Sequence, residues 1–378
     1  MMDTLGSFLR HYLLALQFFT RLPLPARLMA WVGFSPAMMR AAAAHFPGVG
    51  WVVGGCSALA LWGAWQLLSS VGAMLPLGVI PEAVQVGGAV VPLEGAVPGA
   101  AVGAPGSVAV PAASLVPLMP TYVLGCVSAL LVVLLSLMAS VWLTGAFHED
   151  GLADVGDALG GFASREQALR IMKDSRLGTY GTITLLLVVS LKISLLWLLM
   201  LAAGLQATMM ALLAVHVLSR WAPLWLIRWL RYVGATDVAG TGSGVRSPDP
   251  LAAADTAVAS AIAASTSSSA GDVSAGASKS RPMAEDISRR ALLAAGLWCL
   301  PALLLVLAAF GAGATMALCL VAVVLTWQLG LFFRRRLGGV TGDCLGATQQ
   351  LVEVGCHLVL VWAVLAHLSA GLPVGSPM

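Results

Sequence analysis

Residues 121–143 read TYVLGCVSALLVVLLSLMASVWL, a run without a single charged side chain. A helix needs roughly 20 apolar residues to cross the hydrocarbon core of a bilayer, so this run is long enough to span a membrane. The sequence therefore predicts an all-α polytopic membrane protein, a single integral membrane domain over residues 1–378 with a bundle of about seven transmembrane helices. The other runs of similar length lie at 46–68, 181–203, 207–227, 291–311, 314–333 and 351–371.

The composition agrees with a membrane protein. Hydrophobic residues make up 59% of the chain and charged residues only 10%, whereas a soluble domain has roughly 25% charged residues. Lys192 falls inside the run at 181–203, where we expect it to snorkel or to pair within the bundle. We interpret His216 and His357, also inside runs, as packing residues. The six cysteines form no CxxC pair, which favours small core residues over a redox or zinc site.

The basic residues fall on alternate connections between the runs. Because cytoplasmic loops carry an excess of Lys and Arg, we expect the N-terminus and these segments in the cytoplasm and the C-terminus outside. The net charge of +3 then reflects orientation, and no nucleic-acid partner is expected. Residues 1–40 fit an interfacial amphipathic segment better than a cleavable signal. The four basic segments are residues 10–40, 165–176, 228–290 and 334–336.

Two stretches differ in composition from the rest. Residues 71–120 are rich in Gly, Pro, Ala and Val, which predicts an irregular, external low-complexity insert. Residues 234–285 are rich in Ala, Ser, Gly and Asp, which predicts a flexible cytoplasmic linker insert. Without both inserts, a compact helical bundle remains with its polar motifs on one side.

An acidic stretch follows the opening run directly. It reads TGAFHEDGLADVGDALGGFASREQALRIMKDSRLGTYG at 144–181 and holds six of the 17 acidic residues of the chain. Asp150, Asp154 and Asp157 are spaced i, i+4 and i+7, so in a helix they would project from one face. Like charges at this spacing repel, and a divalent cation would compensate them. Ligands that are all oxygen favour Mg²⁺ or Mn²⁺. The alternative is a solvated acidic loop with ordinary helix caps.

Two further motifs combine basic residues, glycines and a carboxylate. Lys173, Asp174 and Arg176, followed by Gly178, suit a phosphate bridged to a metal, because glycine lets backbone N–H groups approach an anion. The alternative is a glycine-capped helix end with interfacial basic anchors. Residues 334–346 read RRRLGGVTGDCLG and lack the lysine spacing of a P-loop. The three arginines there also fit a stop-transfer cluster, and Glu353 could reach the same site.

Taken together, these motifs resemble the cobalamin synthase family, also known as adenosylcobinamide-GDP ribazoletransferases. The family's aspartate block H-x-D-G-L-A-D-x-x-D-G is matched from His148 to Asp157, with Ala158 in place of the last glycine. The resemblance covers most of the chain and skips 71–120 and 234–285. The segments that carry it, in order, are FFTRLPLP (18–25), HFPGVGW (45–51), HEDGLADVGDALGG (148–161), IMKDSRLGTYG (171–181), LSRWAP (218–223) and GGVTGDCLGA (338–347).

The resemblance implies a Mg²⁺-dependent phosphotransferase of the bacterial inner membrane, multi-pass, with its active site facing the cytoplasm. It would join α-ribazole, or its 5′-phosphate, to adenosylcobinamide-GDP to give adenosylcobalamin, or its 5′-phosphate, and GMP. Mn²⁺ could replace Mg²⁺. The lipid bilayer would be a partner, and a homo-oligomer or an association with other cobalamin-assembly enzymes is left open.

We expect the roles of the matching residues as follows. Phosphoryl transfer needs cations to neutralise the phosphates and carboxylates to hold the cations. Asp174 would act as base or as a further ligand, and His148 would also have a catalytic role. The expected metal ligands are Asp150, Asp154 and Asp157, and the expected substrate-binding residues are Lys173, Arg176, Gly178, Gly339, Thr341, Gly342 and Asp343.

Two other functions compete with this interpretation. A CDP-alcohol phosphotransferase would need D-G-x-x-A-R, but Asp154 and Val155 stand where its Ala and Arg are required, and the second half of that motif is missing. A cation-coupled transporter would place its site at mid-membrane in broken helices, whereas this acidic cluster lies between two predicted spans.

Overall fold

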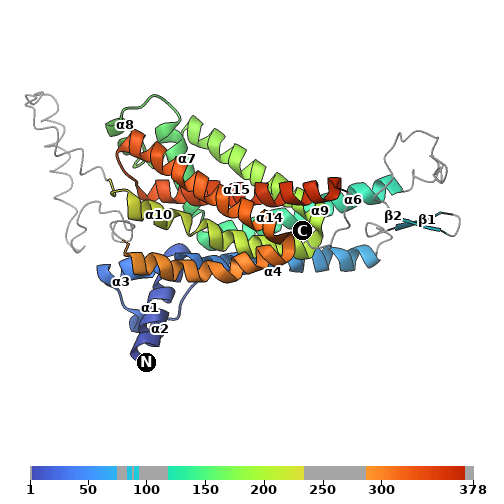
Figure 1. The fold of residues 1–378 in the computed structure, drawn as a ribbon, viewed down its shortest axis with the longest axis horizontal. Helices are drawn as coiled ribbons and strands as arrows, with labels where there is room; N and C mark the ends of the chain where they lie inside the picture. The colour runs from blue at the N-terminus through green and yellow to red at the C-terminus, as the bar shows by residue number, and fades with distance from the viewer. Residues whose placement is uncertain (1, 75–82, 87–88, 93–117, 234–286, 371–378) are drawn as a thin grey trace, which may run out of the picture.

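The computed structural model describes residues 2–74, 83–86, 89–92, 118–233 and 287–370, and long helices dominate it (Figure 1). Most of both predicted inserts, 71–120 and 234–285, lies outside these ranges. The helices are α1 (Met2–Phe19), α2 (Ala26–Val32), α3 (Pro36–Ala42), η1 (Ala43–His45), α4 (Phe46–Met74), α6 (Leu118–Thr144), α7 (Phe147–Leu159), α8 (Arg165–Ile171), α9 (Thr179–Ser219), α10 (Ala222–Trp229), α14 (Arg289–Leu337) and α15 (Gly342–Ser369).

Five helical stretches of the described chain are long and apolar enough to cross a membrane: Pro36–Ser70, Val123–Thr144, Thr179–Trp229, Arg289–Leu337 and Gly342–Ser369. Two of these are broken. Gly204 in α9 has φ 78° and Gly311 in α14 has φ 79°, a region that glycine enters without steric cost. Unbroken, the 49 residues of α14 would extend about 70 Å, more than twice the hydrocarbon thickness.

The chain reverses direction at each break, as Figure 1 shows. A Cβ added at Gly296 would lie 3.4 Å from Trp221, and one at Gly330 would lie 3.0 Å from Leu226. Trp221 and Leu226 are neighbours, whereas a straight helix would separate the two glycines by about 50 Å. Counting the halves on either side of each break, seven helical segments of the described chain cross the bundle. The prediction of an all-α polytopic membrane protein is confirmed.

One predicted span boundary was wrong, and one predicted run contains a short break between two helices. The run at 207–227 is interrupted, because α9 ends at Ser219 and α10 begins at Ala222. The last span begins at Gly342 instead of residue 351. Thr341 caps this helix, since its hydroxyl accepts a hydrogen bond from the Cys344 N–H at 3.3 Å. The polar residues between position 342 and residue 351 therefore belong to α15 and do not form a loop before it.

The four basic segments meet at one end of the bundle. The Arg21 N–H donates to the Leu143 carbonyl at 2.7 Å, the Arg231 guanidinium donates to Gly338 at 3.3 Å, and Arg336 donates to Gly161 at 3.1 Å. At the opposite end of Figure 1 lie the end of α4 and the start of α6. The only strands in the described part of the chain, β1 (Ala83–Val86) and β2 (Ala89–Pro92), also lie there and pair antiparallel. They lie in the segment 71–120 that we predicted to be irregular, and its described ends, 71–74 and 118–120, belong to α4 and α6.

Glycines bring the helices that carry the polar motifs into close contact. A Cβ at Gly151 of α7 would lie 2.9 Å from the Asp343 carbonyl oxygen of α15. At Gly156, one turn or more further along α7, it would lie 2.8 Å from the Thr184 hydroxyl of α9. Since α7 packs against α9 on one side and α15 on the other, these contacts fix the position of its acidic face.

Candidate active site beside helix α7

Helix α7 begins at a sharp turn after α6. Gly145 and Ala146 both have positive φ, 67° and 59°, and Ala146 is the one residue other than glycine with this conformation in the described chain. The turn separates the apolar span from the acidic helix. Glu149 and Asp150 stand in the first turn of α7, where carboxylates interact favourably with the helix dipole.

A groove of about 770 Å³ runs beside α7. One side is formed by the N-terminal helices and the other by the starts of α7 and α15, which contribute Asp150, Gly342 and Asp343. This volume falls in the range of ligand sites, roughly 300–1,000 Å³. The remaining lining residues are Leu14, Gln17, Phe18, Met29, Ala30, Gly33, Phe34 and Phe147.

The carboxylates around this groove repel one another. Burial raises the pKa of Asp154 to about 7, with further contributions from the negative charges of Asp343, Asp150 and Asp157. A cation bound here would relieve that repulsion. Asp150 and Asp154, which the sequence spacing predicted to share one face of a helix, lie near each other. Asp343 of α15 lies near them as well and was not predicted as a metal ligand.

This donor set fits Mg²⁺ in an open site. No three His, Cys, Asp or Glu side chains of the described chain converge into a ready-made metal cage. Mg²⁺, however, commonly uses one or two carboxylates, several waters and the phosphates of a substrate. Oxygen ligands without a thiol also favour this ion over Zn²⁺.

Asp157 has a different environment from the other two aspartates. Its carboxylate accepts hydrogen bonds from the Gly178 N–H at 2.7 Å and the Gly181 N–H at 2.8 Å. These amides belong to the start of α9, whose unsatisfied N–H groups need acceptors. Asp157 therefore joins α7 to α9, and Gly178 serves as the N-cap position of α9.

The exposed connection from α8 to α9 carries Lys173, Asp174 and Arg176, which the sequence predicted as substrate-binding or catalytic residues. The Arg176 guanidinium lies 2.6 Å from the Asp174 carboxylate. Hydrogen bonds from Arg176 lower the pKa of Asp174, which makes this carboxylate a weak base. Lys173 is exposed on the same connection. Through Asp157, this basic connection is held beside the acidic helix.

The glycine-rich turn after α14 has mainly structural contacts. Gly338 ends α14 with φ 73°, and a Cβ at Gly339 would overlap the Arg231 carbonyl oxygen. The Val340 N–H donates to the same Arg231 carbonyl at 3.0 Å. Thr341 caps α15. Of the predicted phosphate-binding residues in this turn, Gly342 and Asp343 line the groove, whereas Gly339 and Thr341 shape the turn.

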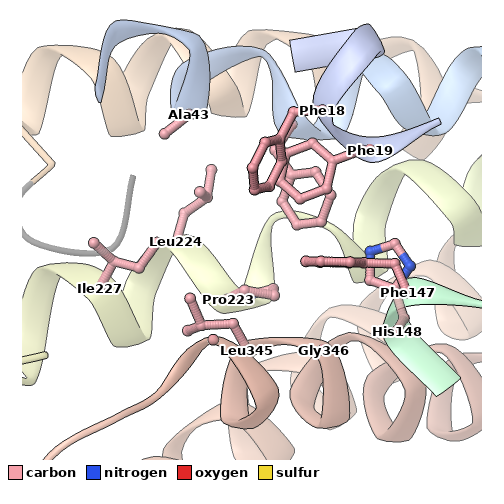
Figure 2. A pocket seen from close by; sticks show the side chains of 12 residues that line it. Phe18, Phe19, Ala43, Phe147, His148, Pro223, Leu224, Ile227, Leu345 and Gly346 are labelled. Atoms are coloured by element: carbon pink, nitrogen blue, oxygen red, sulfur yellow. The ribbon is translucent and has the colours of Figure 1, made fainter. Parts of the chain in front are cut away.

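His148 lies away from the open groove, in an aromatic cluster. It is buried, with its ring 5.8 Å from Phe46 and 6.2 Å from Phe19. Figure 2 shows it beside Phe147 at the wall of a small cavity. Burial, followed by the positive charge of Arg220, holds the pKa of His148 well below its ordinary value, so the imidazole is neutral at pH 7.

A buried polar network behind α7 was not predicted as a unit. Lys192 pairs with Glu353 at 2.5 Å. Glu353 also accepts from Gln349 at 2.6 Å, and Gln350 donates to Glu149 of α7 at 3.0 Å. The predicted last run, 351–371, would leave Glu353 near the membrane edge, but α15 begins earlier, at Gly342, and the residue is buried. The sequence did contain a signal for this network, because Gln349, Glu353 and His357 recur every four residues and so share one face of an apolar helix.

Comparison with known proteins identifies the family. The family model described as cobalamin-5-phosphate synthase matches residues 11–88, 74–266 and 249–361. The adenosylcobinamide-GDP ribazoletransferase of Albidiferax ferrireducens is 39% identical over 372 residues, covering 94% of this chain and 99% of the relative. The enzyme of the same name from Polaromonas naphthalenivorans is 36% identical over 365 residues, covering 94% of this chain and 98% of the relative. The one from Ralstonia nicotianae is 32% identical over 376 residues, covering 98% of this chain and 100% of the relative. No solved structure matches the chain. With relatives aligned over nearly its whole length, this chain belongs to the cobalamin-5-phosphate synthase family.

Proposed function

We propose that the protein is an adenosylcobinamide-GDP ribazoletransferase. A hydroxyl of α-ribazole, or of its 5′-phosphate, attacks the phosphorus next to the cobinamide, the diphosphate bond breaks, and GMP leaves. The relatives that carry this name match 94% of the chain. The observation that carries the proposal is the groove of about 770 Å³ whose edge holds Asp150 and Asp343.

We propose that Asp150 and Asp154, together with Asp343, hold Mg²⁺, or Mn²⁺ in its place. The bound ion would neutralise the charge of the diphosphate and of the leaving phosphate. Asp157, which we predicted as a third ligand, supports the site by joining α7 to α9. Burial and the negative charges of neighbouring carboxylates raise the pKa of Asp154, and a cation at this place would relieve the repulsion among these carboxylates.

Other side chains would bind and orient the substrate. Lys173 and Arg176 are exposed on the connection that Asp157 holds beside α7, where they would neutralise phosphate oxygens. The lowered pKa of Asp174 favours a role in holding Arg176 over a role as general base. The enclosed position of His148 among aromatic rings favours binding over proton transfer.

The experiment is an assay of purified protein with adenosylcobinamide-GDP and α-ribazole, read by mass spectrometry. We expect the joined product and one GMP per product, with both lost when a chelator removes the divalent cation. CMP release from a CDP-alcohol would instead favour the related phosphotransferases. Cation uptake into proteoliposomes without nucleotide release would favour a transporter.

We also propose that the protein lies in the bacterial inner membrane with the groove facing the cytoplasm. The meeting of the four basic segments at one end of the bundle supports this orientation. In a variant without native cysteines, Glu166→Cys should react with a membrane-impermeant thiol reagent only after lysis. Ser70→Cys, at the other end of the bundle, should react in spheroplasts, and the reverse pattern would refute the orientation.

A further inference from the structure

A second groove lies between the first half of α1 and the first half of α14, and the proposed reaction gives it no role. It has a volume of about 680 Å³, which falls in the range of ligand sites. None of its lining residues lines the carboxylate groove, so the two grooves are separate. Its lining residues are Ser7, Phe8, His11, His45, Ala294, Leu297 and Trp298.

Trp298 of α14 forms one wall of this groove and is held by several neighbours. Its ring stacks on Phe8 at 6.0 Å and 22° and on Tyr12 at 5.4 Å and 20°. Its carbonyl accepts a hydrogen bond from the Trp51 indole N–H at 3.1 Å. A Cβ added at Gly48 would lie 2.7 Å from its indole ring, so α4 packs directly against it. These contacts join α1 to α14 and keep this wall in one position.

One edge of the groove opens onto the surface of a membrane span. The first half of α14 belongs to the candidate span Arg289–Leu337. Leu297, which lines the groove, is 65% exposed and belongs to a stripe of exposed leucines that share one helix face. Exposed apolar residues on a membrane span contact the acyl chains of the bilayer, so a lipid chain can enter the groove along Leu297. The stripe consists of Leu293, Leu297, Leu300, Leu304 and Leu307.

The edge toward the start of α14 carries polar and basic side chains. Arg290 is exposed and lies one turn before Ala294, on the same face of the helix. Ser7 and His11 of α1 line the groove and can hydrogen-bond to an oxygen atom. Burial lowers the pKa of His11, so its imidazole is neutral at pH 7. The positive charge at this edge therefore comes from Arg290.

Helix α1 places the groove at the depth of the lipid head groups. Figure 1 shows this helix projecting from the side of the bundle, at the end where the basic segments meet. Leu5, Phe8 and Leu9 are exposed and spaced i, i+3 and i+4, so they share one apolar face. A helix with such a face lies at the boundary between head groups and acyl chains. Phe8 lines the groove as well, so the groove lies at the same boundary.

We propose that this groove binds one anionic phospholipid of the surrounding bilayer. Its acyl chain lies along Leu297 and Trp298, and its phosphate lies at the edge formed by Arg290 and His11. A free phosphate would make no use of the apolar wall. A zwitterionic lipid would bring a second cation next to Arg290, whereas an anionic lipid brings none.

Native mass spectrometry of the detergent-solubilised full chain tests the head-group contact with two lipids of identical acyl chains. We expect the first phosphatidylglycerol to bind about fivefold more tightly than the first phosphatidylcholine, as about 1 kcal/mol per basic residue predicts. Arg290→Gln should remove this preference, whereas Arg290→Lys should keep it. Arg335→Gln, at an exposed position in the second half of α14, is the matched control and should leave the preference unchanged.

Two alanine variants on the leucine stripe test the acyl-chain contact. Leu297→Ala shortens the side chain that lines the groove, and we expect both lipids to bind about fivefold more weakly. Leu304→Ala is the matched control and should leave both affinities unchanged, because Leu304 is 63% exposed on the same stripe but lies outside the groove. If Leu297→Ala does not fold, as judged by thermal unfolding, Phe8→Ala tests the same contact from α1.

Three results would overturn the assignment. The first is equal affinity of the wild type for the two lipids, or a preference that survives in Arg290→Gln. The second is equal weakening by Leu297→Ala and Leu304→Ala, which would show that lipids coat the whole stripe. The third is displacement of phosphatidylglycerol by inorganic phosphate, which would show an anion site without an acyl-chain contact. Lipid binding is measured without nucleotide, so its failure leaves the proposed function untouched.

Discussion

The Lys192 ammonium of α9 lies 2.5 Å from the Glu353 carboxylate of α15, and the two side chains are only 3% and 1% exposed. The first half of α9 is thereby joined to the helix that also contacts α7. Gln350, which accepts from Lys192 at 3.4 Å, donates to Glu149 of α7 at 3.0 Å. The buried pair therefore connects the interior of the bundle to the acidic helix.

Removing one partner of this pair should destabilise the protein. Lys192→Met leaves Glu353 as a buried charge without its partner, and we expect a loss of about 3–5 kcal/mol in unfolding free energy. Denaturant unfolding in detergent micelles measures this loss. Adding Glu353→Gln should restore most of it, since the amide can still accept from Gln349. Asp174→Asn, which breaks an exposed pair, should leave stability unchanged.

Asp150→Asn and Asp154→Asn should each abolish most of the transferase activity. Loss of one charged metal ligand costs on the order of a thousandfold in rate. Membrane abundance should be unchanged, because these carboxylates contribute little to packing. The Mg²⁺ concentration for half-maximal activity should rise. Glu166→Gln, on the exposed start of α8, is the control and should be mild. Normal turnover of Asp150→Asn at limiting Mg²⁺ would leave the acidic face as a solvated surface.

Asp157→Asn should behave differently from the other two aspartate variants. Its carboxylate accepts from two backbone N–H groups of α9, and an amide retains only one acceptor oxygen. We expect a loss of about 1 kcal/mol in unfolding free energy and weaker substrate binding. The Mg²⁺ dependence should stay that of the wild type. A shift in that dependence equal to the shift in Asp150→Asn would restore Asp157 as a metal ligand.

Gly151→Ala should separate α7 from α15. The new methyl group would lie 2.9 Å from the Asp343 carbonyl oxygen and 3.0 Å from its Cα, and backbone atoms cannot turn aside. We expect a cost of about 1–3 kcal/mol and a loss of activity as Asp343 moves away from Asp150. Gly55→Ala, where the added methyl meets no atom within 4 Å, is the matched control. Thermal unfolding and the GMP assay should be run on both variants. Equal stability and equal GMP release in the two would show that the contact at Gly151 tolerates a side chain.

The fold class and the seven crossing segments could be predicted because they depend on local sequence. The length of an apolar run fixes whether it can span a bilayer, whatever its neighbours are. The helical spacing of Asp150 and Asp154 likewise fixed their common face. The reversals at Gly204 and Gly311 were visible as short gaps between runs, at 204–206 and 312–313, although each proved to turn on a single glycine with positive φ.

Only the tertiary structure decided how the polar residues divide their roles. Asp150 and Asp157 look alike in sequence, but one faces the groove while the other bonds to the start of α9. Glu353 appeared interfacial because helix starts are poorly fixed by hydropathy, whereas the Thr341 cap places it in the core. The small cavity beside His148 joins residues from five distant segments of the chain. The sequence by itself determined which residues are polar and which spans carry them. The packing of α7 between α9 and α15 decided which of them meet, because a buried polar group must find its partners from whatever helices lie next to it.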